Sequence, residues 1–172
     1  MATNAPERVF TLKRVLDAPR DLVFQAWTDP ERLQWFFNDT RAIPSDPIVV
    51  DLRVGGEWRQ KMIINDDLEY FTGGIYREIV PVEKLVFTWG AVGGWPAIDR
   101  DYPDDDLVVT VTLNDLGERG EQTEMIFQLA MPAHLSDERV REWLAMGIRE
   151  GWSDPIDRLV THFNWKASEW TQ

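Results

Sequence analysis

The strongest constraint on the fold is the contrast between the middle of the chain and its end. From Ile48 to Met131 the sequence is a succession of short segments in which apolar and polar residues alternate, separated by turns rich in glycine, proline and aspartate. Alternation with a period of two is typical of strands with one buried face. From Ser136 to Phe163 the apolar residues instead recur with the 3.6-residue period of a helix. This order favours an α+β fold, in which one long carboxy-terminal helix covers a curved antiparallel sheet.

Strands and turns follow from the local patterns. One strand is expected at residues 8–17, and about six more follow at residues 48–54, 57–65, 70–80, 85–89, 107–114 and 123–131. Gly55-Gly56 predicts a two-residue hairpin turn, because both glycines tolerate positive φ. Gly73-Gly74, inside a strand, indicates a bulge or a sharp bend.

Two short helices are expected between the first strand and the others, from Pro19 to Phe37. Asp29-Pro30 has the form of a second helix start, a carboxylate N-cap followed by proline at the first helical position. The long helix is expected to begin after Ser136 as its N-cap, and Pro155 predicts a kink or an interruption near Gly151. A long helix across a bent sheet does not fill the whole concavity, so we expect a cavity between them.

Composition excludes several classes of function. The chain has 172 residues, so we expect a single domain over residues 8–165 with tails at 1–7 and 166–172. Its net charge of −12 disfavours nucleic acid and anionic membranes as partners, and it has no cysteine for disulfides or thiolate chemistry. No apolar run approaches the ~20 residues of a membrane span, and residues 1–8 contain no signal-peptide core, so we expect a cytoplasmic protein.

Three segments in the same order resemble a known family. Ala18–Glu31, Asp51–Trp58 with its D-x-R-x-G-G pattern, and Gly74–Trp89 with G-x-Y-x-E-I-x-P-x-x-[KR]-L-V-F-T-W are similar to motifs of the SRPBCC (START/Bet v 1-like) superfamily. Within it they resemble the AHSA1-like branch, named after the activator of Hsp90 ATPase. Gly151-Trp152 and Asp157–Leu159 are similar to that branch's closing helix. The resemblance implies a helix-grip fold with a hydrophobic ligand cavity, and it implies no shared catalytic residue.

The aromatic residues are the main candidates for a binding site. The chain has nine Trp, eight Phe and three Tyr, and these rings either fill a core or line a cavity. The helix-grip architecture favours a cavity for at least some of them, since apolar concave pockets are the usual form of small-molecule sites. The expected lining residues are Trp35, Phe37, Trp58, Gln60, Met62, Phe71, Tyr76, Phe87, Trp89, Trp143 and Trp152.

Polar candidates are fewer. Arg53 is a candidate anchor for an anionic group, although the favoured interpretation is structural, with Arg53 paired with Asp51 on the same strand face or exposed to solvent. Arg59, Gln60 and Glu124 are candidates to polarise a ligand carbonyl if one of them points inward. His134 and His162 lie too far apart for a zinc motif, and the acidic loop at residues 99–106 lacks the ligand order of a calcium loop, so no metal or other cofactor is expected.

Three functions remain open at this point. The first is binding of a hydrophobic or aromatic small molecule between the last helix and the sheet, with the loop at residues 90–106 and the second short helix forming the entrance. The second is a cyclase- or dehydratase-like enzyme acting on polyketide-like or aromatic substrates. The third is a protein-binding module of the Hsp90 co-chaperone type. A monomer or a homodimer fits each of them.

Overall fold

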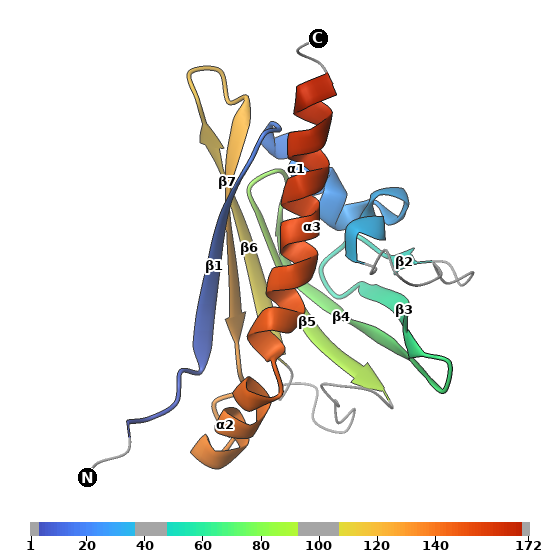
Figure 1. Ribbon diagram of the computed structural model, residues 1–172, viewed down its shortest axis with the longest axis vertical. Helices are drawn as coiled ribbons and strands as arrows, with labels where there is room; N and C mark the ends of the chain where they lie inside the picture. Colours follow the sequence, from blue (N-terminus) through green and yellow to red (C-terminus); the bar gives the residue numbers. More distant parts are fainter. Residues whose placement is uncertain (1–3, 37–47, 93–106, 170–172) are drawn as a thin grey trace.

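Seven antiparallel strands form one curved sheet in the computed structural model, which describes residues 4–36, 48–92 and 107–169 (Figure 1). The strand order is β1-β7-β6-β5-β4-β3-β2, so neighbours in sequence are neighbours in space except where β1 joins β7. The strands are β1 (Val9–Leu16), β2 (Val49–Val50), β3 (Glu57–Asn65), β4 (Leu68–Val80), β5 (Lys84–Val92), β6 (Leu107–Leu116) and β7 (Gln122–Ala130). The expected α+β helix-grip architecture is confirmed.

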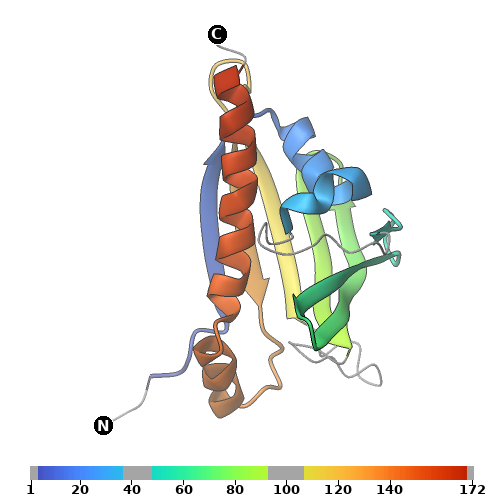
Figure 2. The ribbon, with the colours of Figure 1, turned by 45° about the vertical axis from the view of Figure 1, so that its right-hand side comes forward.

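The helices gather on one face of this sheet. They are α1 (Arg20–Thr28), the 3₁₀ helix η1 (Pro30–Phe36), α2 (Asp137–Ala145) and α3 (Ile148–Glu169). Figure 2 shows α3 running along β1 and β7, with α1 and η1 beside it on the same face of the sheet. Helix α1 packs on β6 and β7, and η1 packs against both α1 and α3. The long helix therefore covers one edge of the face, and the short helices continue the cover towards the other edge.

Helix starts agree with the sequence signals. The Asp29 carboxylate accepts a hydrogen bond from the Glu31 backbone N–H at 3.0 Å, where η1 begins. The Ser136 hydroxyl accepts one from the Arg139 backbone N–H at 3.2 Å and caps α2. Both expected caps are confirmed.

The helical break falls elsewhere than expected. The chain leaves helical geometry at Gly147, whose φ of 91° is in the left-handed region, and this residue separates α2 from α3. Pro155 lies inside α3 without ending it, so of the two outcomes expected near Gly151, a kink or an interruption, the interruption is wrong. Proline removes one helical hydrogen bond, and here the buried ring and the packing of α3 outweigh that loss.

Two turn predictions also need correction. The strand expected at residues 48–54 is only two residues long, because residues 51–56 form a longer connection in which the Asp51 backbone N–H still donates to the Glu57 carbonyl at 2.9 Å. The register shift of β4 lies between Tyr76 and Glu78 rather than at Gly73-Gly74. The two glycines allow close packing instead: a Cβ on Gly73 would lie 2.3 Å from the Trp58 carbonyl oxygen, and Gly74 is described below.

No helix in the described ranges combines the length and apolar character needed to cross a membrane. The expected entrance loop falls mostly on residues 93–106, and both expected tails extend to the chain ends at 1–3 and 170–172; these stretches lie outside the described residues.

Candidate functional site

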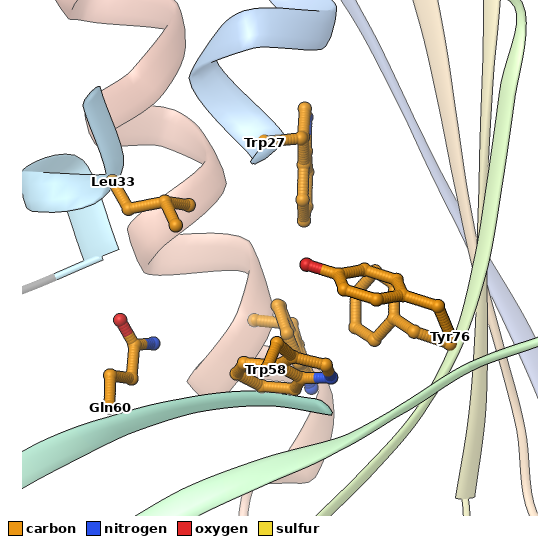
Figure 3. Close-up of a pocket in the computed structure, with 7 residues that line it drawn as sticks. Trp27, Leu33, Trp58, Gln60 and Tyr76 are labelled. Atoms are coloured by element: carbon orange, nitrogen blue, oxygen red, sulfur yellow. The ribbon is translucent and has the colours of Figure 1, made fainter. Parts of the chain in front are cut away.

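A small cavity lies where the two helical covers meet the sheet (Figure 3). The empty volume is about 370 Å³ when the open mouth is included, and the cavity proper has a volume of about 30 Å³. That inner space holds about two water molecules. The walls come from six elements and consist of Trp27, Leu33, Trp58, Gln60, Tyr76, Phe87 and Trp152.

Strand alternation directs the sheet residues of the cavity. Trp58 and Gln60 are buried on β3, whereas Arg59 between them is exposed, which is the two-residue period of a strand with one covered face. Gln60 is opposite Thr72 on β4, and Tyr76 is opposite Phe87 on β5. The three neighbouring strands therefore present these five buried side chains to the same face.

The close approach of β4 depends on glycine. Trp58 is opposite Gly74, and its indole N–H reaches past β4 to donate to the Thr88 carbonyl on β5 at 3.1 Å. A Cβ on Gly74 would lie 1.8 Å from that same carbonyl oxygen. Glycine at this position thus makes room for the indole that forms the floor of the cavity.

The aromatic walls meet at several different angles, and two of the ring pairs are edge to face. The Trp58 and Phe87 rings are 5.3 Å apart at 77°, and the Tyr76 and Phe87 rings are 6.3 Å apart at the same angle. Trp27 lies between Phe87 and Trp152, at 6.3 Å and 6.5 Å. Rings fixed at such angles leave gaps that flexible side chains would fill, which is one source of the cavity.

Two neutral polar side chains face this space. Figure 3 shows the Tyr76 hydroxyl and the Gln60 amide both pointing into the cavity. Gln60 is only 2% exposed, and its Oε1 atom has no hydrogen-bond partner among the described residues. Burial raises the pKa of Tyr76 well above its usual range, so its hydroxyl remains a neutral donor at physiological pH.

No Asp, Glu, His, Lys or Arg is among the residues that line the described cavity. The nearest cationic groups on β3 are on its other face, where the Arg59 guanidinium and the Lys61 ammonium lie 5.0 Å and 5.9 Å from the centre of the Phe71 ring. The cavity is therefore apolar and uncharged, with a hydrogen-bond acceptor and a donor in its wall.

Five of the residues expected from sequence, Trp58, Gln60, Tyr76, Phe87 and Trp152, come together in this cavity. Trp89 is buried beside it, where its indole N–H donates to the Thr72 hydroxyl at 2.9 Å and its ring meets Trp152 edge to face. Trp143 is partly buried against the core through α2. Neither of these two is among the residues that line the cavity.

Other expected residues lie away from the cavity. Phe71 is 39% exposed, because it is five positions from the inward-facing Tyr76 on the same strand and so has the opposite parity. Arg53 pairs with Asp51 at 2.8 Å in the exposed 51–56 connection, and Arg59 covers Phe71. Glu124 accepts a hydrogen bond from Asn114 at 3.2 Å on the face of β7 turned away from the helices.

The remaining expected residues are Trp35, Phe37 and Met62. Phe37 lies outside the described residues, as do the side chains of Trp35 and Met62. Conversely, Trp27 and Leu33 line the cavity but are not among the lining residues expected from sequence. Their apolar character was a usable signal, because the short helices that carry them pack on each other and, through α1 and η1, on the sheet and α3.

The described residues contain no cluster of three or more His, Asp or Glu side chains that would hold a metal ion. His134 lies in the connection between β7 and α2, and His162 packs edge to face against its neighbour Phe163 at 5.4 Å. The candidate site is thus the aromatic cavity alone.

Comparison with known proteins identifies the family. Residues 17–164 match the model of the family described as "Activator of Hsp90 ATPase homolog 1-like protein". No curated protein matches the sequence. The chain belongs to this AHSA1-like family, whose domains commonly bind ligands or proteins.

Solved structures share the fold at low sequence identity. Protein Ms6760 from Mycobacterium smegmatis is 20% identical with a TM-score of 0.70, over 90% of this chain and 89% of that one. Protein NE0264 from Nitrosomonas europaea is 22% identical with a TM-score of 0.70, over 93% and 96% of the two chains. DynU16, a putative protein in the dynemicin biosynthetic locus, is 23% identical with a TM-score of 0.59, and the match spans 92% of this chain but 48% of that one.

Proposed function

We propose that this AHSA1-like protein binds a hydrophobic or aromatic small molecule in the cavity between α3, the two short helices and the sheet. The observation that carries the proposal is the Gln60 Oε1 atom, a buried acceptor without a hydrogen-bond partner among the described residues, in a wall made otherwise of rings, Leu33 and a tyrosine. Leaving such an atom unpaired costs about 1–3 kcal/mol, which a bound molecule with a donor group would recover.

The chemistry of the wall supports a ligand with a flat apolar body. Three indoles, a phenyl and a phenol ring surround the space. Removal of ligand surface from water contributes about 25 cal/mol per Å² before the entropic costs of binding. One relative of known structure lies in a small-molecule biosynthetic locus, that of dynemicin, which agrees with a role in small-molecule binding.

Size sets a condition on binding. The inner space of about 30 Å³ is too small for an aromatic ring, so a ligand enters only when part of the wall moves outward. Leu33 is the wall residue best placed to move, because it lies on η1, a seven-residue 3₁₀ helix whose hydrogen bonds are weaker than those of an α-helix. Binding therefore couples to displacement of η1 in this proposal.

An enzymatic role is less well supported. A cyclase or dehydratase needs an acid or base at the reacting atoms, and the described lining contains no carboxylate, imidazole or amine. Tyr76 is the one titratable side chain in that described lining, and its raised pKa makes it a poor base at neutral pH.

A thermal-shift and tryptophan-emission titration tests the proposal. Toluene, phenol, indole, naphthalene and decanoate are added to the full chain; a ligand at a hundred times its Kd stabilises the fold by about 2.7 kcal/mol, and it changes the emission of the wall tryptophans. Leu33→Phe, which adds volume to the wall, is expected to abolish the shift. Leu68→Phe, at an exposed position on β4, is the matched control and is expected to leave it unchanged.

The proposal fails if none of the five compounds changes either signal. Native mass spectrometry of the purified protein provides an independent check. A co-purifying small molecule would support the proposal, and its loss in Leu33→Phe but not in Leu68→Phe would locate it in the cavity.

A further inference from the structure

The polar atoms of the cavity limit which ligands it accepts. We infer that the site selects neutral ligands with a hydroxyl group on an aromatic ring, and that Gln60 is the residue that determines this selectivity. This inference rests on the proposed function and specifies the ligand class. It follows from three properties of the wall, taken in turn below.

The first property is the contrast between Gln60 and the other buried polar groups nearby. The Trp58 indole donates to the Thr88 carbonyl at 3.1 Å, and the Trp89 indole donates to the Thr72 hydroxyl at 2.9 Å. The Thr72 hydroxyl in turn donates to the Gly90 carbonyl at 2.9 Å. Gln60 lies directly opposite Thr72, yet its Oε1 has no partner within the described residues. Because the polar groups around it are hydrogen-bonded, the Gln60 Oε1 atom is available to accept a hydrogen bond from a ligand that enters the cavity.

The second property is the position of Tyr76 on the neighbouring strand, with its hydroxyl facing the same space as the Gln60 amide (Figure 3). Because burial raises the pKa of Tyr76, this group stays protonated and can donate a hydrogen bond. A ligand hydroxyl can donate to Gln60. Tyr76 lies four residues along β4 from Thr72, the partner of Gln60, so its hydroxyl offers a donor to a different part of the same ligand. A ketone lacks the donor that Gln60 requires.

The third property is that no described lining residue could neutralise the charge of an anionic ligand. The lining residues in the described part of the chain include no cation, and the Arg59 and Lys61 head groups lie over Phe71 on the opposite face of β3. The chain as a whole carries a net charge of −12. A carboxylate would lose its hydration without gaining a counter-ion, and it would meet the acceptor oxygen of Gln60, so carboxylic acids are disfavoured.

A set of three small probes tests this selectivity. Phenol, toluene and benzoate share one ring and differ in their substituent, and phenol is neutral at pH 7 because its pKa is near that of tyrosine, about 10. Calorimetric titration of the full chain is expected to give phenol an affinity about tenfold higher than toluene, with benzoate at least about a hundredfold weaker than phenol. Hydrophobicity alone predicts the reverse order for phenol and toluene, since toluene is the more apolar of the two.

Variants assign the selectivity to Gln60. Gln60→Met keeps the length of the side chain and removes its hydrogen bonds, and it is expected to reduce the phenol preference from about tenfold to about equal affinity. Gln128→Met makes the same substitution at an exposed position on β7 and is expected to leave the preference unchanged. The probe series on the unmodified protein keeps the inference testable if Gln60→Met does not fold.

The outcomes separate the two proposals. Toluene or benzoate binding as tightly as phenol, or an unchanged preference in Gln60→Met, overturns the inference and leaves the proposed function standing. If phenol, toluene, benzoate and the larger compounds all fail to bind the unmodified protein and its variants, both proposals are overturned. The cavity would then hold only about two water molecules.

Discussion

The two halves of the covered sheet face differ in how completely they are packed. In the half formed by β1, β7 and β6 under α3, called here the packed half, Phe10, Phe127 and Leu129 are almost fully buried. The Phe127 ring lies 4.9 Å from Trp152 of α3 and 6.4 Å from Phe10 of β1. In the half formed by β5, β4 and β3, called here the cavity half, rings of similar size surround a space.

The difference follows from what covers each half. The packed half is under α3, a 22-residue α-helix fixed to β1 by the Arg14–Asp157 ion pair at 2.8 Å. The cavity half is under η1, a helix of seven residues with one described apolar side chain, Leu33, in the cavity wall. A short helix contributes few side chains, so the space between it and the curved sheet is left partly unfilled. The cavity thus lies at the border of the area that α3 covers, where α3 contributes Trp152 to the wall and the short helices contribute Trp27 and Leu33.

Truncation of a leucine in each half gives the largest expected difference. Leu159→Ala in α3 removes a fully buried side chain and is expected to lower the free energy of unfolding by about 3–5 kcal/mol. Leu33→Ala in η1 is expected to cost only about 2 kcal/mol, because one side of Leu33 already faces empty space and fewer contacts are lost. Urea denaturation of both variants measures the two values. Equal costs would contradict the distinction between the halves.

Gly74 is expected to be the next most sensitive position. Gly74→Ala places a Cβ 1.8 Å from the Thr88 carbonyl oxygen, so β4 and β5 must separate and Trp58 loses its hydrogen bond; a cost of about 2–3 kcal/mol is expected. Gly55→Ala is the control. It meets nothing within 4 Å and is penalised only by its φ of 85°, at about 1 kcal/mol. Thermal denaturation of the pair, with near-ultraviolet circular dichroism of Trp58, checks both the order and the cause.

Most of the fold could be predicted from periodicity. Alternation between Glu57 and Asn65 marked β3, and the 3.6-residue period marked the helical end of the chain. The errors came where tertiary packing outweighs local preference. Pro155 does not end α3, because the burial of this helix outweighs the local effect of proline. The break falls instead at Gly147, which has a left-handed φ, and the sequence does not show which of its glycines adopts that conformation.

The site was predictable in kind and only partly in detail. Alternation correctly grouped Trp58 with Gln60, since both are even-numbered residues on one regular strand. It could also have excluded Phe71, whose parity opposes that of Tyr76. What the sequence could not reveal is which buried polar atom lacks a partner, because the pairing of Trp58 and Trp89 with β4 and β5 groups depends on the register between strands.

Alkaline stability tests the burial of the Tyr76 hydroxyl. Because the folded protein disfavours tyrosinate, the stability that Tyr76 contributes is fully present below its unfolded pKa of about 10 and is lost as the pH rises above that value. Tyr76→Phe is expected to reduce this loss by about 1.4 kcal/mol per pH unit.

Tyr70→Phe is the comparison variant, at a half-buried tyrosine whose pKa is also raised by burial, and it is expected to give a smaller reduction. Urea denaturation at a series of pH values above 9 measures both. Equal slopes in Tyr76→Phe and the parent would contradict burial of this group.

The smallest expected effect is a gain in stability at Gln60. Without ligand, Gln60→Met replaces a buried acceptor that has no partner among the described residues by an apolar side chain of similar length, so the variant is expected to be more stable by about 1 kcal/mol. Gln128→Met, on the exposed side of β7, is expected to change stability by less than about 0.5 kcal/mol.

A gain in stability at position 60 would mean that the unmodified glutamine destabilises the protein without ligand, which is the pattern of a residue retained for binding. A loss of 1 kcal/mol or more would instead mean that the Gln60 amide is satisfied in the free protein, by water or by chain outside the described residues, and the cavity half would then be as complete in its polar pairing as the packed half.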